Sequence, residues 1–582
     1  MHKLARALTV WLVVSIGIGC GLPARAVASP SPGFLVIAPD RGYLGNEEIK
    51  AAWAEFGNTH LTRLVFISLT EDYQRDVRAR LEGAVAEMQR EEATEIVLIP
   101  FVVSEADPHL KKARDLLANA KVRVAPVFGG SPPARQILED RVRTLSKEPS
   151  KERLVVIGFG ATSREEADAM TRELERLAVE VQETLHLADM SIAIFYAGQA
   201  PDAVRDQGNA LAETTIVRAI KKTDLRTLVV PFHLGYKHTG SMRLSQKIES
   251  LLSAGAGAYD GRELLPDPLV SRWLRKTASH YLPLRREEVG IVVMAHGAGE
   301  YYNTRILAAV EPLRQRYNIE VAFGMADDEI LQATIDKVEA RGAKRIHVLR
   351  LYDLPQSFQA ETEFVLGLRN TMGAVSHSHN EKSGPSRIRS GAILSTSGGF
   401  GDHPLIAEIL LQRTLEVSQA PDRETVILLA HGSGDDEDER SWIEQLEKRA
   451  EFIRKKAPAK FKAIKVATVR EDWPEKSARA VVEVRKMIKE GSRENGRVLV
   501  VSNRIAGAGP YRKLLSGLDY TLNDQGIASH PHFTRWIEEQ IENWIDAAGL
   551  LHTPIARGGN NLLERGKEKA SKSALARLTT DC

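Results

Sequence analysis

The chain has 582 residues, of which 43% are hydrophobic and 27% charged, and its formal net charge at pH 7 is +2. This length predicts about three to five domains, and the near-neutral charge excludes the strongly basic face of a nucleic-acid-binding protein. The two cysteines, Cys20 and Cys582, lie near the chain ends, so the body of the chain has no cysteine zinc site, disulfide framework or iron–sulfur cluster.

Residues 1–28 have the pattern of a secretory signal peptide. Lys3 and Arg6 precede an apolar run over residues 7–20, and small-residue cleavage motifs follow at 24–28. The run is short for a membrane span, and no later run is long enough, so we expect an exported mature protein, periplasmic or secreted, without a membrane span. An uncleaved anchor is one alternative. Lipidation at Cys20 is another, although Gly17 stands where a lipoprotein signal has Leu.

Four segments open in the same way, which indicates an internal repeat. Each is an apolar, β-branched run followed by a glycine-rich stretch, the pattern of a buried parallel strand that enters a loop. In chain order they are "FLVIAPDRG" (34–42), "LVVIGFGATS" (154–163), "IVVMAHGAG" (291–299) and "VILLAHGSG" (426–434).

Two further landmarks recur in the same order in every repeat. A second buried strand ends in a turn, and then a helix begins with Pro in its first turn, as in "SHPHFTRWIEEQI" (529–541), where capping explains His530 and His532. We therefore predict repeats over 33–150, 151–285, 286–420 and 421–550. A Ser/Gly/His-rich insertion (373–391) interrupts the third repeat, and a basic, disordered tail covers 553–582.

Each repeat alternates strands and helices, which predicts an α/β fold with mostly parallel sheets covered by helices on both faces. Ligands of such sheets bind beyond the carboxyl ends of the strands. His296 and His431 directly follow the opening strands of repeats three and four, so we expect both at the ligand-binding edge. A lone strand-end histidine is more often structural, but two in the same phase favour function.

The strand–"AHGS"–helix opening, the "VVPFHLGYKH" strand (229–238) and the "HP" helix start together resemble the class II tetrapyrrole chelatases. More narrowly, the chain resembles the sirohydrochlorin cobaltochelatase and ferrochelatase family. In that family two histidines line a cleft, bind a divalent metal and handle pyrrole protons. Larger members fuse two repeats into a bilobal unit, so the resemblance implies two bilobal units here, over roughly 33–285 and 286–550.

The family histidines are divided between the two halves of the chain. His296 and His431 match the first family histidine, whereas Pro39 and Phe159 stand at that place in repeats one and two. His238 matches the second family histidine, and His109 matches it less closely. The resemblance thus implies His296 and His431 as catalytic residues and metal ligands, with His238 and His109 as further ligands.

Imidazole suits borderline ions such as Co²⁺, Fe²⁺ and Ni²⁺ and accepts protons near neutral pH. We expect a metal chelatase (a lyase) that inserts a divalent ion, Co²⁺ first, into sirohydrochlorin or a related tetrapyrrole. The metal is a substrate, and the glycine loops do not form a nucleotide-binding motif. The alternatives are an exported metal- or tetrapyrrole-binding protein without turnover and a mainly structural interaction protein. The oligomeric state stays open.

Overall fold

The computed structural model of the chain describes residues 31–548, except residues 223, 237, 240–241, 253–256, 284 and 373–384. The predicted signal peptide, the lipidation alternative at Cys20, the predicted tail and most of the predicted insertion lie outside the described residues. Among the described helices, none is both long enough and apolar enough to cross a membrane.

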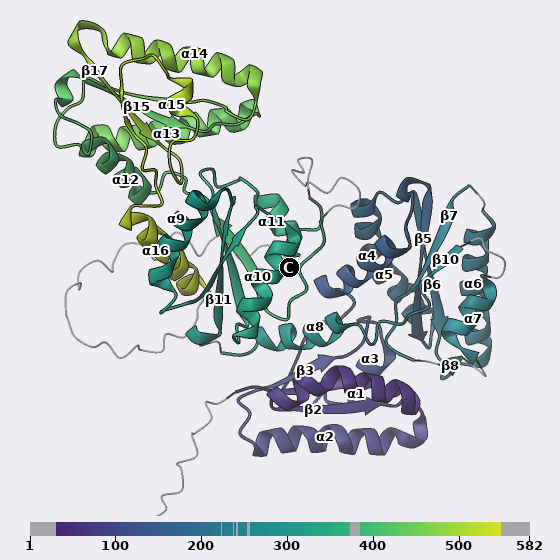
Figure 1. Cartoon of the computed structure of the whole chain (residues 1–582). Helices are drawn as coiled ribbons and strands as arrows, with labels where there is room; N and C mark the ends of the chain where they lie inside the picture. Colours follow the sequence, from purple (N-terminus) through teal and green to yellow (C-terminus); the bar gives the residue numbers. More distant parts are fainter. Residues whose placement is uncertain are drawn as a thin grey trace, which may run out of the picture.

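Four parallel four-stranded sheets follow one another along the chain, and all have the same strand order (Figure 1). In each sheet the first strand of the repeat lies between the second and the third, and the fourth pairs with the third. We call these sheets with their helices lobes 1 to 4. The predicted α/β fold with four parallel-sheet repeats is confirmed, and each sheet lies within one predicted repeat, whose exact boundaries stay a prediction.

The strands have the following bounds: in lobe 1, β1 (Gly33–Pro39), β2 (Thr62–Ile67), β3 (Ile96–Pro100) and β4 (Val122–Val124); in lobe 2, β5 (Glu152–Ala161), β6 (Asp189–Tyr196), β7 (Arg226–Pro231) and β10 (Gly257–Tyr259); in lobe 3, β11 (Val289–Ala295), β12 (Asn318–Phe323), β13 (Arg345–Leu351) and β14 (Ile393–Gly398); in lobe 4, β15 (Glu424–Ala430), β16 (Ala463–Thr468), β17 (Arg497–Ser502) and β18 (Thr521–Asn523). A small antiparallel hairpin, β8 (His238–Thr239) and β9 (Met242–Arg243), follows β7.

The helices have the following bounds: α1 (Gly42–Thr59), α2 (Gln74–Arg90), α3 (Pro108–Leu116) and α4 (Pro132–Leu145) in the first repeat; α5 (Arg164–Leu185), α6 (Asp202–Lys221), α7 (Leu244–Leu251) and α8 (Pro268–Ser279) in the second; α9 (Glu300–Val310), α10 (Asp328–Ala340), α11 (Gln359–Val365) and α12 (Pro404–Leu415) in the third; α13 (Asp436–Lys456), α14 (Pro474–Gly491), α15 (Tyr511–Leu514) and α16 (Pro531–Ala547) in the fourth. Helices cover both sheet faces, which explains why β1, β11 and β15 are buried along their whole length.

The last helix of each repeat packs on the neighbouring lobe. Helix α4 lies against α5 and β7, and α8 lies against α1; in the same way α12 lies against α13, and α16 lies against α9 (Figure 1). Each of these four helices begins with Pro after a capping side chain that accepts a backbone N–H, namely Ser131, Asp267, His403 and His530. The exchange joins lobes 1 and 2 into a front unit and lobes 3 and 4 into a rear unit.

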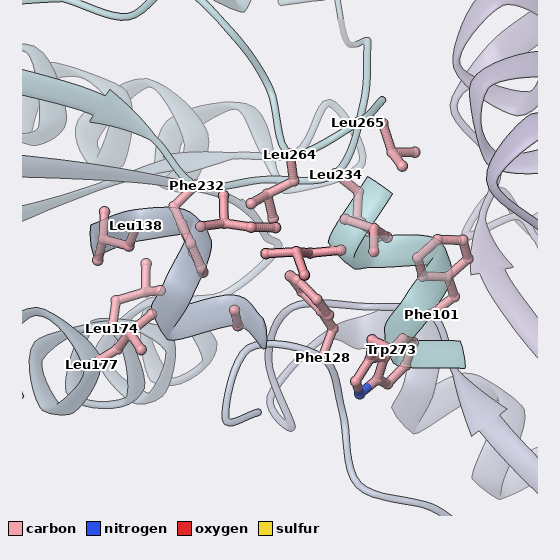
Figure 2. Close-up of a cluster of buried hydrophobic side chains, with 14 of the residues drawn as sticks. Phe101, Phe128, Leu138, Leu174, Leu177, Phe232, Leu234, Leu264, Leu265 and Trp273 are labelled. Carbon is pink, nitrogen blue, oxygen red and sulfur yellow. The ribbon is translucent and has the colours of Figure 1, made fainter. Parts of the chain in front are cut away.

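These helices place apolar side chains of one repeat in the core of the neighbouring lobe. In the front unit, Trp273 of α8 packs edge-on against Phe128 of lobe 1, with ring centroids 5.4 Å apart, and the same cluster continues to Phe232 of lobe 2 (Figure 2). In the rear unit, fully buried Trp536 of α16 packs edge-on against Phe400 of lobe 3. Burial of such large aromatic side chains dominates core energetics, so one core cluster spans both lobes of the front unit, and α16 of the fourth repeat completes a core cluster of lobe 3.

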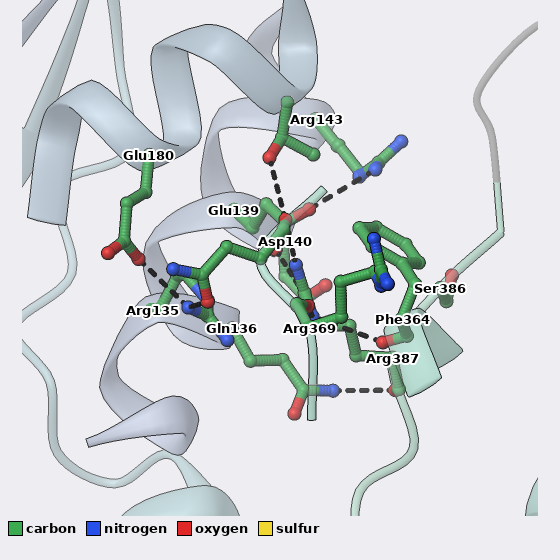
Figure 3. A network of polar contacts seen from close by, with 12 residues as sticks. Arg135, Gln136, Glu139, Asp140, Arg143, Glu180, Phe364, Arg369, Ser386 and Arg387 are labelled. Atoms are coloured by element: carbon green, nitrogen blue, oxygen red, sulfur yellow. Dashed lines mark hydrogen bonds and ion pairs between the residues drawn. The ribbon is translucent and has the colours of Figure 1, made fainter. Parts of the chain in front are cut away.

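A buried polar contact joins the two units (Figure 3). Glu139 of α4 pairs with Arg387 of the third repeat at 2.8 Å, and each side chain is only 3% exposed. Gln136 donates to the Arg387 carbonyl at 2.6 Å, and the Arg387 guanidinium also lies over the ring of Phe364. A buried charge is tolerated only when paired and hydrogen-bonded, so this contact holds the front unit in one place against lobe 3.

Candidate metal centre

His296 and His431 occupy the same position at the carboxyl ends of β11 and β15, as predicted. The next residue is a glycine with positive φ in both lobes, Gly297 at 76° and Gly432 at 83°, a conformation that favours glycine. In both, Nδ1 lies 2.7 Å from the carbonyl oxygen of that glycine. A carbonyl only accepts, so Nδ1 carries the proton and Nε2 is left as the metal ligand or proton acceptor.

Two carboxylates face Nε2 of His431. Asp472 Oδ2 lies 2.9 Å and Glu471 Oε1 3.4 Å from this atom. Both acids follow β16, which pairs with β15, so their side chains meet His431 at one sheet edge. The three ligand atoms lie within 4.8 Å of one another. An imidazole lone pair and two carboxylates arranged in this way can together ligate one divalent metal ion.

Glu471 is held in place but keeps a free oxygen. Its Oε1 accepts a hydrogen bond of 2.5 Å from Arg504, which follows β17. Its Oε2 is buried and has no hydrogen-bond partner among the described residues. A buried polar atom without a partner is costly, and a bound cation would satisfy it. The positive charge of Arg504 opposes tight binding, which suits an ion that must be released.

Among the described residues, His296 has no such acidic partners. The backbone of the following strand end matches lobe 4: Met325 and Arg470 both have positive φ, at 58° and 47°. By this register Ala326 stands where lobe 4 has Glu471, and Asp327 stands where it has Asp472. The Asp327 carboxylate accepts the N–H of Ile330 at 2.9 Å and caps α10. In the described part of lobe 3, His296 therefore belongs to no three-ligand group.

The loops of the two histidines border the contact between lobes 3 and 4. Burial raises the pKa of Tyr302, which lies close to the His296 backbone, and the positive charge of Arg504 from lobe 4 partly offsets this rise. Tyr301 approaches Gly507 of lobe 4 closely enough that a Cβ added at this glycine would lie 3.5 Å from the Tyr301 ring. Within the described residues, no hydrogen bond or ion pair links the His296 imidazole to His431.

A buried anchor fixes the two lobes beside this edge. Arg449 of α13 is fully buried and pairs with Asp353, which follows β13 in lobe 3. Asn503, which follows β17, accepts from Arg449 at 2.7 Å and donates to Asp353 at 2.5 Å. The three side chains satisfy one another, as a buried polar network must.

The front unit fills the equivalent positions with other side chains. Pro39 and Phe159 stand where lobes 3 and 4 have histidine, and the Arg41 guanidinium lies over the Phe159 ring at 5.4 Å. Burial lowers the pKa of Arg41 to about 10. Burial also lowers the pKa of the neighbouring His233 to about 3, so its imidazole is neutral. This position of the front unit therefore has an aromatic ring and a cation, and no group of three metal ligands among the described residues.

The structure does not unite the second-position histidines with this centre. His109 lies in the first turn of α3, where its Nδ1 and its backbone N–H both meet the Asp107 carboxylate at 2.8 Å. His238 begins the β8 strand, and its side chain lies outside the described residues. Metal ligation by His109 and His238 stays a prediction.

Glu471 and Asp472 are not among the site residues expected from the sequence, and a more conspicuous acidic run, residues 435–439, lies at the start of α13. In that run, Asp435 caps the helix by accepting two backbone N–H groups, and Asp436 pairs with Arg470 and Lys476, which lowers its pKa to about 2. The signal for them in the sequence is the pair "ED" (471–472), which follows the "KAIKVAT" segment (462–468) after two intervening residues. Neighbouring parallel strands end at one edge, so an acidic pair there should have been placed beside His431.

Comparisons with known proteins give little beyond the fold. No protein-family model matches the chain, and no curated protein matches it. Among solved structures, the chain is similar to DR2241 from Deinococcus radiodurans, described as a multi-domain protein with structural similarity to chelatases and two additional novel domains. The identity is 15%, the TM-score is 0.29, and the match covers 44% of this chain and 54% of that protein, about half its length. Similarity at this level carries no argument about activity.

Proposed function

We propose that the rear unit binds a divalent metal ion through His431, Glu471 and Asp472 and inserts it into a tetrapyrrole. The observation that carries the proposal is the convergence of these three side chains on one strand edge, with one buried carboxylate oxygen left unpartnered among the described residues. An imidazole and carboxylates suit borderline ions such as Co²⁺. The first substrates to test are Co²⁺ and sirohydrochlorin, which follow from the chelatase resemblance of the sequence.

The proposed roles follow from the tautomers. Insertion exchanges one M²⁺ for the two N–H protons of the macrocycle. As the ion leaves, Nε2 of His431 is free to accept one proton, and Nε2 of His296 in lobe 3 accepts the other. The three-ligand set is partly exposed and lies beside the Arg504 cation, so it favours release. The metal is a substrate throughout and does not remain with the protein.

A second candidate is a protein that binds metal or tetrapyrrole without turnover. Two observations favour it: Pro39 and Phe159 replace the histidine in the front unit, where Arg41 lies over the Phe159 ring, and His296 lacks acidic partners among the described residues. Export through residues 1–28, which we also propose, favours it as well, because tetrapyrrole assembly is usually cytoplasmic.

The deciding experiment follows the absorbance of sirohydrochlorin with Co²⁺ and the purified chain. We expect metal insertion above the spontaneous rate for the natural chain and near the spontaneous rate for His431→Ala and Glu471→Gln. The control is His186→Asn, at an exposed left-handed position after α5 that asparagine tolerates. A spontaneous rate in every protein, with Co²⁺ still bound by the natural chain alone, would support the carrier. Equal acceleration by all variants would exclude His431 and Glu471 from the site.

A further inference from the structure

The front unit contains a cavity of about 530 Å³ that is separate from the metal centre. Its walls come from three lobes: the loops after β3 and β4 of lobe 1, the ends of β5, β6 and β7 with one face of α5 in lobe 2, and residues 367–370 of lobe 3. This volume falls within the range of roughly 300–1,000 Å³ that small-molecule sites occupy.

The cavity has an apolar floor. It is formed by side chains of lobe 2, several of which belong to the cluster in Figure 2: Phe159, Met170, Leu174, Leu177, Ile194 and Phe232. The carboxylates on the wall already have partners within the protein. Glu180 pairs with Arg135, Glu105 with Arg114, Glu173 accepts the Glu105 N–H, and Asp107 accepts from His109.

Two arginines on the wall have hydrogen-bond donors without partners among the described residues. Arg135, in the first turn of α4, is only 7% exposed, and its Nη1 donates to Glu180 and Asn370 (Figure 3). Nε is buried, and neither Nε nor Nη2 makes a hydrogen bond to a described residue, so the side-on edge of the guanidinium has no acceptor among them. Arg176 on the rim makes no hydrogen bond or ion pair with the described residues either.

A guanidinium edge whose Nε and Nη2 lack an acceptor has the geometry that binds two oxygens of one carboxylate or phosphate. The start of α4 provides few backbone donors, because Pro132 and Pro133 have no N–H and the N–H of Ala134 donates to the Ser131 hydroxyl. The missing partner is therefore an oxygen acceptor beside an apolar floor.

We propose that this cavity binds an amphipathic oxyanion, a ligand with an apolar body and one carboxylate or phosphate head. The negatively charged head binds Nε and Nη2 of Arg135, and Arg176 at the rim adds positive charge. The apolar body lies on Phe159, Phe232 and the leucines of α5. The ligand contacts both the front unit and lobe 3. This proposal does not depend on metal chemistry in the rear unit.

The test is calorimetric titration of the full chain with dodecanoate and with dodecyl phosphate, below their micelle concentrations. Dodecanol and dodecylammonium are the neutral and cationic controls. We expect the anions to bind at least about tenfold more tightly than either control, because only they supply the acceptor. The stronger of the two anions identifies the head group. Binding of dodecanol or dodecylammonium as tight as that of the anions would overturn the proposal.

Three variants locate the site. Arg135→Lys keeps the positive charge but loses the paired Nε and Nη2 donors, so we expect about tenfold weaker binding of the anions. Gly130→Trp should abolish it, because Gly130 lines the cavity and a Cβ there meets no heavy atom within 4 Å. Gly83→Trp on α2, equally unobstructed, is the control. If Arg135→Lys fails to fold, Gly130→Trp still decides: binding equal to that of Gly83→Trp would place the ligand elsewhere and refute the proposal.

Discussion

Lobes 3 and 4 place a histidine at the same point of the same turn, and they differ in what meets it. The strand, the positive-φ glycine and the Nδ1 contact to a carbonyl are shared. In lobe 4 the next strand end supplies Glu471 and Asp472. In lobe 3 it supplies Ala326, and Asp327 is used as a helix cap. The backbone conformation that the two lobes share determines the tautomer of both histidines. The turn after the neighbouring strand determines whether a metal ion at the histidine has further ligands.

This difference indicates a division of labour within the rear unit. Lobe 4 has the ligand set of a metal site, and lobe 3 has a histidine with a free Nε2 and, among the described residues, no charge to hold an ion. While an ion is bound in lobe 4, Nε2 of His431 is occupied, so the unligated Nε2 of His296 is available to accept a proton. We expect substitutions in lobe 4 to change metal affinity and substitutions in lobe 3 to change insertion rate.

The largest effect is expected from the anchor that holds the two lobes together. Arg449→Met leaves the Asp353 carboxylate buried and unpaired, which costs roughly 3–5 kcal/mol of unfolding free energy. Denaturant unfolding measures it. Because every proposed metal ligand lies in lobe 4, Co²⁺ affinity of the folded variant should stay near that of the natural chain while tetrapyrrole insertion falls.

A double variant controls for this interpretation. Arg449→Met with Asp353→Leu removes both charges, and buried ion pairs replaced by apolar residues are often neutral. We expect this variant to recover most of the lost stability. No recovery, or no loss in the single variant, would show that the Arg449–Asp353 pair does not hold the lobes.

Metal affinity is the next largest effect. Outer partners of a metal site alone contribute about 10–100-fold, so His431→Ala and Glu471→Gln should each weaken Co²⁺ binding by about 100-fold, roughly 2.8 kcal/mol. His296→Ala should weaken it by less than about threefold, because His296 has no acidic partner among the described residues to hold an ion. Competition with a metal-indicator dye measures all three. Equal losses for His296→Ala and His431→Ala would contradict the assignment of the metal to lobe 4.

The dependence of stability on acid pH also differs between lobes 3 and 4. By strand register, His347 of β13 matches Leu499 of β17. Burial lowers the pKa of His347 to about 3, and its ring is stacked on Trp544. The unfolded chain binds the proton first, near pH 6.5, so the stability contributed by His347 is complete above that pH. It decreases by about 1.4 kcal/mol per pH unit as the pH falls toward 3.

His347→Leu gives lobe 3 the residue of lobe 4 and should make unfolding less dependent on pH between 6 and 4. Denaturant unfolding at several pH values checks the slope. Buried His233 in the front unit contributes a similar slope in both proteins, so only the difference between them is informative. An unchanged slope would show that His347 is already protonated in the folded chain.

The sequence predicted the fold through features that repeat. Apolar strands, glycine turns and proline helix starts recur four times, and each is a local consequence of backbone chemistry, so four sheets and the positions of His296 and His431 could be predicted. The paired acids could not be found in this way, because Glu471 and Asp472 lie about 40 residues from His431 and meet it only through the pairing of β15 with β16.

Other parts of the site depend on contacts that no local pattern encodes. The exchange of α4 with α8, and of α12 with α16, depends on which lobe each apolar helix face meets. The Arg41–Phe159 contact in the front unit joins two lobes, and the Glu139–Arg387 pair joins two units, at large sequence separations. A charged residue gives no signal in the sequence of whether it will be buried with a partner or left in water.

The smallest effect is expected from a substitution that makes the histidine site of lobe 3 resemble that of lobe 4. Ala326→Glu places a carboxylate at the position that Glu471 has in lobe 4, where the half-buried Ala326 follows the left-handed Met325. We expect the number of bound Co²⁺ ions at high concentration to rise from about one to about two per chain. The added site should be at least about tenfold weaker than that of lobe 4, because Asp327 remains tied to the α10 cap and only two ligands are present. Equilibrium dialysis measures the stoichiometry, and Ala326→Gln, which adds similar volume without charge, is the control. If both variants bind as the natural chain does, Glu471 is not what distinguishes the two lobes, and the orienting contact from Arg504 becomes the feature that lobe 3 lacks.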